Sequence, residues 1–296
     1  MTMELSAIAR IAAALVSALL IAFITTPVVK SLAQIVGAVD VPKDGRRMHD
    51  HPIPRMGGLA IFLGFLLSTL LFVPMSSSLR GMLLGGVIIV ILGIFDDIYA
   101  LPAKPKLVVQ IVAALVAVLH GNVIQVLSNP NIFSDNPYWV LGKLAVPLSV
   151  IWIVAITNAV NLIDGIDGLA AGGSAFSFLV IGLMFSLKGL WLYSMLAFSA
   201  LGCLIPFLYF NVWGRTAKGT KMFMGDAGAL SLGYLLSFLV IKYAVYVSET
   251  EPDVKNLVIP FTLLFIPMFD VLRVMLVRAM HHRPLFIADK NHLHHK

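Results

Sequence analysis

Nine long apolar runs constrain this chain more strongly than any other feature of its sequence. A helix needs about 20 apolar residues to cross a bilayer, and soluble domains do not carry such runs in series. The 296 residues are 59% hydrophobic and 12% charged, with a mean hydropathy of +0.94. We therefore predict an all-α integral membrane protein, a polytopic bundle of about nine transmembrane helices that forms a single domain over residues 1–296. The runs are Ala7–Val29, Gly57–Val73, Gly81–Tyr99, Leu107–Leu119, Val140–Ala159, Leu169–Leu187, Leu190–Phe210, Ala227–Val247 and Leu257–Val277.

Two of these runs need comment. The first could be mistaken for a signal peptide, but it is long, shows no clear cleavage site and leads into a basic loop, so we expect an uncleaved helix. The fourth is short for a span and is expected to extend toward Leu127. The segment Val123–Leu127 also has the composition of a small hairpin strand.

Basic residues favour one orientation of the spans. With the N-terminus outside, 15 of the 21 Lys and Arg residues fall in inner segments and six fall outside. The positive-inside rule then places the inner segments and the C-terminus in the cytoplasm. Most aspartates lie on the same side, so we expect the functional site on the cytoplasmic face of the membrane.

The stretch 157–172 is the most polar interruption between two apolar runs. Asn158, Asn161, Asp164 and Asp167 follow one another at steps of three, and would share one face if the preceding helix continued. Their oxygen atoms are ligands that suit Mg²⁺. A polar turn kept in water is the weaker alternative.

Adjacent carboxylates, Asp96 and Asp97, end the third run. Acidic groups at membrane depth are costly and are expected to be paired, bound to metal or functional. Neighbouring residues point about 100° apart on a helix, so the two aspartates are expected to address different partners. Lys104 and Lys106 follow, and either neutralise the aspartates or hold a phosphate.

The cytoplasmic loop 211–228 carries Asn211, Phe223 and Asp226. Asp226 is expected at the start of a helix, where a role as N-cap would explain it without any catalytic chemistry. The other interpretation is a metal ligand, and an N-cap that also binds a metal is compatible with both. Phe223 either packs or stacks on a base. The first cytoplasmic loop, 39–58, is rich in Pro, Gly, Arg and His, is expected to be irregular, and serves either as a positive-inside anchor or as an anion site.

Two further groups of charged residues lie toward the C-terminus. Asp270 and Arg273, at i and i+3, read first as an intramembrane ion pair that fixes packing. The tail carries Arg283 and the histidine motif that ends at His295. Without a cysteine nearby, a phosphate clamp explains these side chains better than a zinc site.

Taken together, the motifs resemble those of the polyprenyl-phosphate N-acetylhexosamine-1-phosphate transferases. They occur in the order of that family and cover nearly the whole chain. The similarity is greatest to the bacterial branch that transfers GlcNAc-1-phosphate from UDP-GlcNAc to undecaprenyl phosphate, because the last motif is His-Leu-His-His rather than three consecutive histidines. The motifs are Val-Asp-Val-Pro to Pro-Arg-Met-Gly-Gly (39–58), Phe-Asp-Asp (95–97), Asn-Ala-Val-Asn-Leu-Ile-Asp-Gly-Ile-Asp-Gly (158–168), Phe-Met-Gly-Asp-Ala-Gly (223–228) and His-Leu-His-His (292–295).

The resemblance implies a role for each matching residue. Asn161 and Asp226 correspond to Mg²⁺ ligands, with Mn²⁺ as an alternative ion, and Asp96 and Asp97 to the catalytic pair. Relatives usually continue past the histidine motif into a further membrane helix, so we expect either that this chain is truncated or that its last helix is missing. The implied substrate-binding residues are Asp40, Lys104, Lys106, Asn158, Asp164, Asp167, Asn211, Phe223, Arg283, His292, His294 and His295.

The expected partners are a UDP-N-acetylhexosamine, undecaprenyl phosphate and the lipid bilayer, with no nucleic acid and with a homodimer as one assembly to test.

The alternative functions are that of the sister phospho-MurNAc-pentapeptide transferase and, from another class, that of a membrane transporter. A transporter would place its ionisable residues near the middle of the membrane in an internal repeat, whereas here they gather at one face. A prenyltransferase would need Asp-Asp-x-x-Asp, but Ala100 stands at the last position. A CDP-alcohol phosphotransferase would need further aspartates in the run 169–187, which has none.

Overall fold

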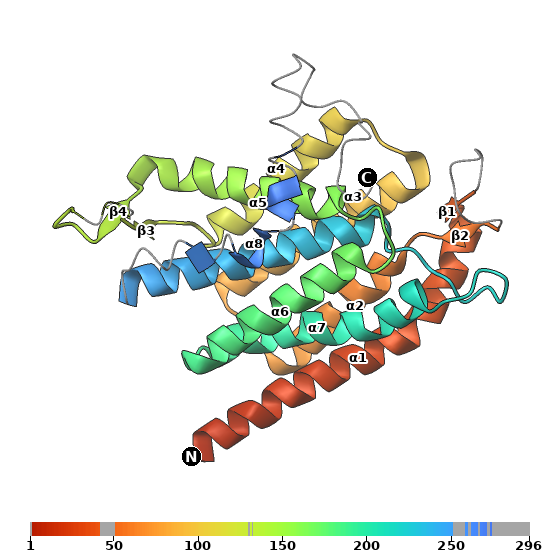
Figure 1. Ribbon diagram of the computed structural model, residues 1–296, viewed down its shortest axis with the longest axis horizontal. Helices are drawn as coiled ribbons and strands as arrows, with labels where there is room; N and C mark the ends of the chain where they lie inside the picture. The colour runs from red at the N-terminus through yellow and green to blue at the C-terminus, as the bar shows by residue number, and fades with distance from the viewer. Residues whose placement is uncertain are drawn as a thin grey trace.

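The computed structural model describes residues 2–41, 51–129, 131, 133–250, 258–259, 262–265, 267–270 and 273. Its described part is a bundle of long helices with two small β-hairpins (Figure 1). The helices are α1 (Thr2–Val36), α2 (Gly57–Phe72), α3 (Ser77–Tyr99), α4 (Ala103–Leu119), α5 (Ala145–Leu162), α6 (Leu169–Leu187), α7 (Trp191–Val212) and α8 (Gly225–Thr250). The strands are β1 (Val39–Asp40), β2 (Ile53–Pro54), β3 (Val126–Ser128) and β4 (Tyr138–Val140), and a 3₁₀ turn, η1 (Gly142–Leu144), precedes α5.

Six helices of the described chain are long and apolar enough to cross a membrane. They are α1, α3, α5 together with η1, α6, α7 and α8, while α2 is a shorter apolar helix. The prediction of an all-α, multi-pass membrane protein is confirmed. Eight of the nine apolar runs form helices. About half of the ninth, Leu257–Val277, lies outside the described residues, and its described residues are mostly helical.

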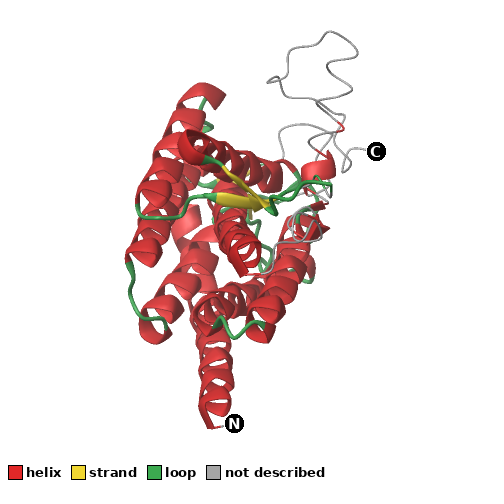
Figure 2. Ribbon diagram, turned by 90° about the vertical axis from the view of Figure 1, so that its left-hand side faces the viewer, coloured by secondary structure: helices red, strands yellow, loops and turns green. Residues whose placement is uncertain are grey.

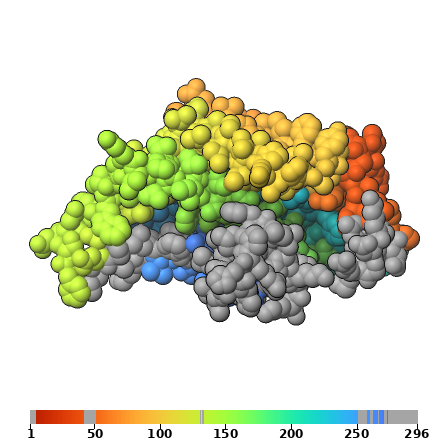
Figure 3. Space-filling view, turned by 90° about the horizontal axis from the view of Figure 1, so that it is seen from above, coloured from red at the N-terminus to blue at the C-terminus, as the bar shows by residue number. Residues whose placement is uncertain are grey.

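The strands mark the two ends of the bundle. Strands β1 and β2 pair antiparallel, with Asp40 opposite Ile53, next to the starts of α2 and α8. We call this the site end. Strands β3 and β4 pair with Leu127 opposite Trp139 and project from the opposite end, which we call the hairpin end (Figures 1 and 3). Figure 2 looks along the helices from the hairpin end, with the strands crossing in front.

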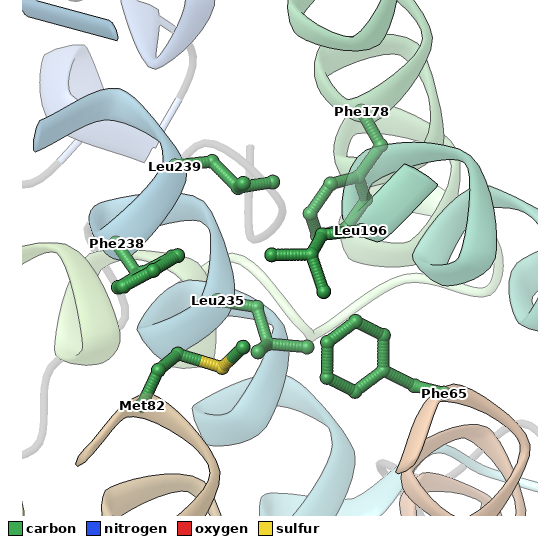
Figure 4. A pocket seen from close by; sticks show the side chains of 7 residues that line it. All are labelled: Phe65, Met82, Phe178, Leu196, Leu235, Phe238 and Leu239. Carbon is green, nitrogen blue, oxygen red and sulfur yellow. The ribbon is translucent and has the colours of Figure 1, made fainter. Parts of the chain in front are cut away.

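Helix α8 is the core of the bundle. It packs against α2, α3, α5 and α6, and most of its side chains from Ala227 to Val247 are buried. Small residues allow this close packing: a Cβ added to Gly233 would lie 2.7 Å from the Cα of Thr157 on α5. Around its middle, apolar side chains from five helices enclose a gap too narrow for a water molecule (Figure 4).

Three local expectations need correction. The fourth run does not extend toward Leu127, because α4 ends at Leu119 and the chain turns at Gly121, where φ is +91°. Helix α5 ends at Leu162, so Asp164 and Asp167 lie in the following turn and do not continue a helical face. Asp226 is not the N-cap of α8, because the helix already begins at Gly225. The hairpin is confirmed, with its first strand at 126–128 rather than 123–127.

Candidate active site

The start of α8 is held against α2 and α3 through glycines. A Cβ added to Gly58 would lie 1.9 Å from the nitrogen of Gly228, and one added to Gly93 would lie 2.2 Å from the Cα of Ala227. Both contacts are with backbone, so the neighbour cannot turn aside. Gly225 has a φ of +73°, which a residue with a side chain adopts only at a cost. These glycines let three helix ends meet where the acidic motifs lie.

Backbone hydrogen bonds tie the first loop to the segment before α8. Phe223 donates its N–H to the carbonyl of Pro54 at 2.8 Å, and accepts from Gly57 at 3.0 Å. Gly58 donates to the carbonyl of Met224 at 2.9 Å. Two motifs that are about 165 residues apart in sequence therefore form one continuous surface at the site end.

Asp97 caps α8 from a different helix. Its carboxylate accepts the N–H of Asp226 at 2.9 Å and that of Ala227 at 3.2 Å, and its side chain is fully buried. The first N–H groups of a helix have no partner within that helix, and a carboxylate is well suited to accept them. Arg55 adds a third donor, from its Nε to Oδ1 at 3.1 Å.

Asn161 and Asp226 are in direct contact. Asn161, in the last turn of α5, donates from Nδ2 to Oδ1 of Asp226 at 2.6 Å. The other oxygen of Asp226 lies 3.4 Å from Nη2 of Arg55. The two residues that the family resemblance names as metal ligands are thus neighbours, as predicted.

Asp96 turns away from its neighbour and toward α4. Its Oδ2 accepts from Nζ of Lys106 at 2.6 Å, and its Oδ1 accepts the N–H of Leu101 at 2.7 Å. Asp96 and Lys106 also act electrostatically on Asp226, so both aspartates of the pair belong to one charged cluster. The expectation that they address different partners is confirmed, and Lys106 neutralises Asp96 while Lys104 is exposed. We call Arg55, Asp96, Asp97, Lys106, Asn161 and Asp226 the carboxylate centre.

The turn after α5 is clamped by Asn211 of α7. Asn211 accepts the N–H of Gly168 at 2.7 Å and donates to the carbonyl of Met222 at 3.0 Å and to Asp167 at 3.4 Å. Lys221 forms an ion pair with Asp167 at 2.5 Å. Asn211 therefore joins the 163–168 turn to the loop that leads into α8.

Asp164 lies in the same turn and faces the acidic residues of the site. Burial, together with the negative charges of Asp226 and Asp167, raises the pKa of its carboxyl group from 3.8 to about 7, while Arg55 opposes the rise. The described side chains thus leave excess negative charge at this point. A bound cation would relieve it.

Asn158 lies one turn deeper than Asn161 and pairs with Gln110 on α4. Asn158 donates to Gln110 at 2.5 Å, and Gln110 donates back at 3.3 Å. Sequence analysis missed Gln110, although a polar residue inside an apolar run is a usable signal. It also assigned no specific role to Arg55 or Lys221, which lie in basic loops where a single arginine or lysine does not stand out.

The donor set suits a hard divalent cation. No group of three His, Cys, Asp or Glu side chains close enough to chelate a metal occurs within the described residues. Mg²⁺ does not need one, since it is commonly held by one or two carboxylates plus substrate phosphates and water. Asn161 and Asp226 fit that pattern, because Nδ2 of Asn161 lies 2.6 Å from Oδ1 of Asp226 and the carboxyl group of Asp164 adds negative charge beside them.

The remaining predicted residues are placed as follows. Asp40 is half-buried in β1, and Phe223 is half-buried in the segment bonded to the first loop. Arg283, His292, His294 and His295 lie outside the described residues. Their assignment to substrate binding stays a prediction.

Comparison with known proteins agrees with the geometry. The sequence model of glycosyl transferase family 4 matches residues 79–244. A protein of Bacillus subtilis strain 168 named probable undecaprenyl-phosphate N-acetylglucosaminyl 1-phosphate transferase is 38% identical over 97% of this chain and 77% of its own length. The decaprenyl-phosphate N-acetylglucosaminephosphotransferase of Mycobacterium tuberculosis H37Rv is 33% identical over 95% of this chain and 74% of its own length. The undecaprenyl-phosphate alpha-N-acetylglucosaminyl 1-phosphate transferase of Escherichia coli K12 is 28% identical over 90% of this chain and 70% of its own length.

Proposed function

Because the chain belongs to glycosyl transferase family 4 and to its polyprenyl-phosphate N-acetylhexosamine-1-phosphate transferases, we propose that it transfers GlcNAc-1-phosphate from UDP-GlcNAc to undecaprenyl phosphate. An oxygen of the lipid phosphate attacks the β-phosphorus of UDP-GlcNAc. The bond from that phosphorus to the bridging oxygen breaks, and UMP leaves. The product is a lipid-linked GlcNAc diphosphate.

One observation carries this proposal: charged and amide side chains from four separate segments meet at one end of a membrane bundle. Asp96 and Asp97 come from α3, Asn161 from α5, Asp226 from α8, and Arg55 from the first loop. A phosphate on a lipid and a soluble nucleotide can both reach this end, where apolar helices give way to charged loops. The distribution of basic residues supports placing the site end at the cytoplasmic face of the bacterial inner membrane.

We propose Asn161 and Asp226 as the residues that hold Mg²⁺, with Mn²⁺ as a substitute. When bound, the ion would supply positive charge to the diphosphate and offset the charge that develops on the leaving UMP. The direct contact between the two side chains and the raised pKa of Asp164 support this assignment.

Side chains of the protein are proposed to bind and orient the acceptor phosphate. One carboxylate of the Asp96–Asp97 pair is proposed to orient the acceptor phosphate or to take its last proton. Both are held in place, Asp97 by α8 and Arg55 and Asp96 by Lys106 and the N–H of Leu101. With a second pKa near 6, a phosphate is largely dianionic at pH 7, so proton removal contributes little. We propose Lys106, paired with Asp96, as a cation for the acceptor phosphate.

Release of UMP from the purified protein tests the proposal. The protein in detergent is given a short polyprenyl phosphate, Mg²⁺ and, in turn, UDP-GlcNAc, UDP-GalNAc and UDP-MurNAc-pentapeptide. We expect UMP release with UDP-GlcNAc only when both the lipid phosphate and Mg²⁺ are present. Release with UDP-MurNAc-pentapeptide alone would identify the sister activity instead, and no release with any of the donors would overturn the proposal.

A second assay addresses the number of chemical steps. Labelled UMP is incubated with UDP-GlcNAc and protein without lipid. Exchange of label into UDP-GlcNAc would require a covalent phospho-sugar intermediate on an aspartate, whereas no exchange supports direct attack by the lipid phosphate. Because both oxygens of Asp97 accept N–H groups of α8 and both oxygens of Asp96 are also hydrogen-bonded, we expect no exchange.

A further inference from the structure

Arg55 is the only residue of the first loop whose described side chain reaches two aspartates from different helices. Its Nε donates to Oδ1 of Asp97 on α3 at 3.1 Å, and its Nη2 lies 3.4 Å from Oδ2 of Asp226 on α8. The guanidinium group presents several donors in a rigid fork, so one side chain can hold two carboxylates at a fixed separation. A third of the Arg55 side chain remains exposed.

The surroundings of Arg55 show what this bridge holds in place. Pro54 and Gly57, which flank the Arg55–Met56 pair, are hydrogen-bonded to Phe223, and Gly58 is hydrogen-bonded to Met224, directly before α8. A Cβ added to Gly225 would lie 2.2 Å from the carbonyl oxygen of Arg55 and 2.5 Å from Oδ2 of Asp97. The backbone and side chain of Arg55 therefore contact the start of α8 together.

Asp226 has one oxygen directed to Asn161 and the other to Arg55. These two contacts fix the rotation of its carboxylate. Without Arg55, Asp226 would lose its contact with the cation of the first loop, and Asp97 would keep the two N–H groups of α8.

We propose that Arg55 is a positioning residue that sets the orientation of Asp226 and locks the first turn of α8 against α3. This inference rests on the proposed transferase function for its effect on turnover, but not for its effect on structure. Arg55 acts through Asp97 and Asp226 and does not itself touch the reacting atoms. Lysine cannot replace it, because a single ammonium group on a flexible stem does not fix two carboxylates at once.

The test compares Arg55→Gln and Arg55→Lys with Arg80→Gln, which removes an exposed arginine at the hairpin end. Hydrogen–deuterium exchange of peptides covering 222–230 is measured without substrate, and kcat and KM are measured for both substrates. We expect faster exchange at Asp226 and Ala227 in both Arg55 variants. We also expect kcat to fall about 10- to 100-fold, the range for a misplaced catalytic group, with KM changed much less. Arg80→Gln should match the wild type in both measurements.

Each other result overturns the inference in a distinct way. Full activity in Arg55→Lys would show that only the positive charge matters. A fall in turnover with unchanged exchange would show that Arg55 contacts a substrate directly, and unchanged exchange and turnover in Arg55→Gln would show no role. The exchange measurement needs no substrate, so it tests Arg55 even if the wild-type protein transfers no sugar phosphate. If Arg55→Gln does not fold, Arg55→Lys, which keeps the charge, carries the same comparison.

Discussion

At the site end, ion pairs join distant segments, whereas at the hairpin end the corresponding joints are mostly neutral hydrogen bonds. Arg55 pairs with Asp97 and Asp226, Lys106 with Asp96, and Lys221 with Asp167. At the hairpin end, Ser78 bonds to Asn122, Ser149 accepts the N–H of Ile124, and Ser248 accepts the N–H of Ser128. Helices α3 and α8 take part in these joints at both ends.

The difference shows that the charges at the site end are not needed merely to connect helices. Neutral bonds do that at the hairpin end without the cost of desolvating charges. Carboxylates kept beside one another at the site end therefore point to a ligand that neutralises them. Substitutions at the two ends should separate loss of activity from loss of stability.

The largest contrast is expected for Asp226→Ala and Asn161→Ala. Each removes an oxygen that the proposed ion would use, and loss of one electrostatic group that stabilises the transition state typically costs about 10²- to 10³-fold in kcat. UMP release at saturating substrate measures it. Asp135→Ala, in the exposed loop at the hairpin end, is the matched aspartate and should behave as wild type. Near-normal turnover in either site variant would remove that residue from the proposed metal site.

A second contrast concerns glycines. In Gly58→Ala the new methyl group would meet the backbone of Gly228 at 1.9 Å, so α2 and α8 must separate. We expect a loss of about 3 kcal/mol in stability, at the upper end of the range for overpacking, together with a loss of turnover. Thermal unfolding in detergent measures the first effect. Gly172→Ala on α6, where nothing lies within 4 Å, is the control and should be neutral or slightly stabilising. Equal unfolding temperatures for the two variants would contradict the close contact.

Lys106→Met should give a smaller loss of stability. It leaves Asp96, whose side chain is 3% exposed, without its cation. Breaking a buried ion pair costs about 3–5 kcal/mol, and we expect roughly 2 kcal/mol here because Lys106 is partly exposed. Lys242→Met at the hairpin end should cost less, because among the described residues this lysine bonds to the carbonyl of Gly121 and lies over the Phe238 ring, without an ion pair. If Lys242→Met were the more damaging variant, the charge contrast between the ends would be wrong.

The fold could be predicted from the sequence to the extent that burial in lipid leaves a hydropathy signal. The positions of eight helices were predicted because each needs an apolar run. The start of α4 was not, since Ala103-Lys104-Pro105-Lys106 is polar yet helical, and proline is tolerated in a first helical turn. The break after Leu162 was also missed as a boundary, because steps of three suit both a helix and a glycine-containing turn.

The sequence motifs predicted which acidic residues and which asparagine lie in the carboxylate centre, but not which of these residues contact one another. The motifs indicated which acidic residues gather, and Asn161 and Asp226 do meet. That Asp97 caps α8 across 129 residues of sequence depends on Gly58 and Gly93 bringing three helix ends together. No local pattern encodes that approach, so Asp97 and Asp96 looked equivalent in the sequence and are not equivalent in the structure.

The smallest loss of stability is expected for substitutions of buried asparagines. These substitutions should also separate the two ends most clearly by their effect on turnover. Asn122 accepts from the hydroxyl of Ser78 at 2.5 Å and donates to its carbonyl at 2.9 Å. Asn122→Ala should cost about 1 kcal/mol of stability, the usual net value of such bonds, and leave UMP release within twofold of wild type. Asn211→Ala, the same change at the site end, should lower turnover as well, because it frees the 163–168 turn from the loop before α8. Parallel losses of activity in both variants would mean that the hairpin end also shapes the site.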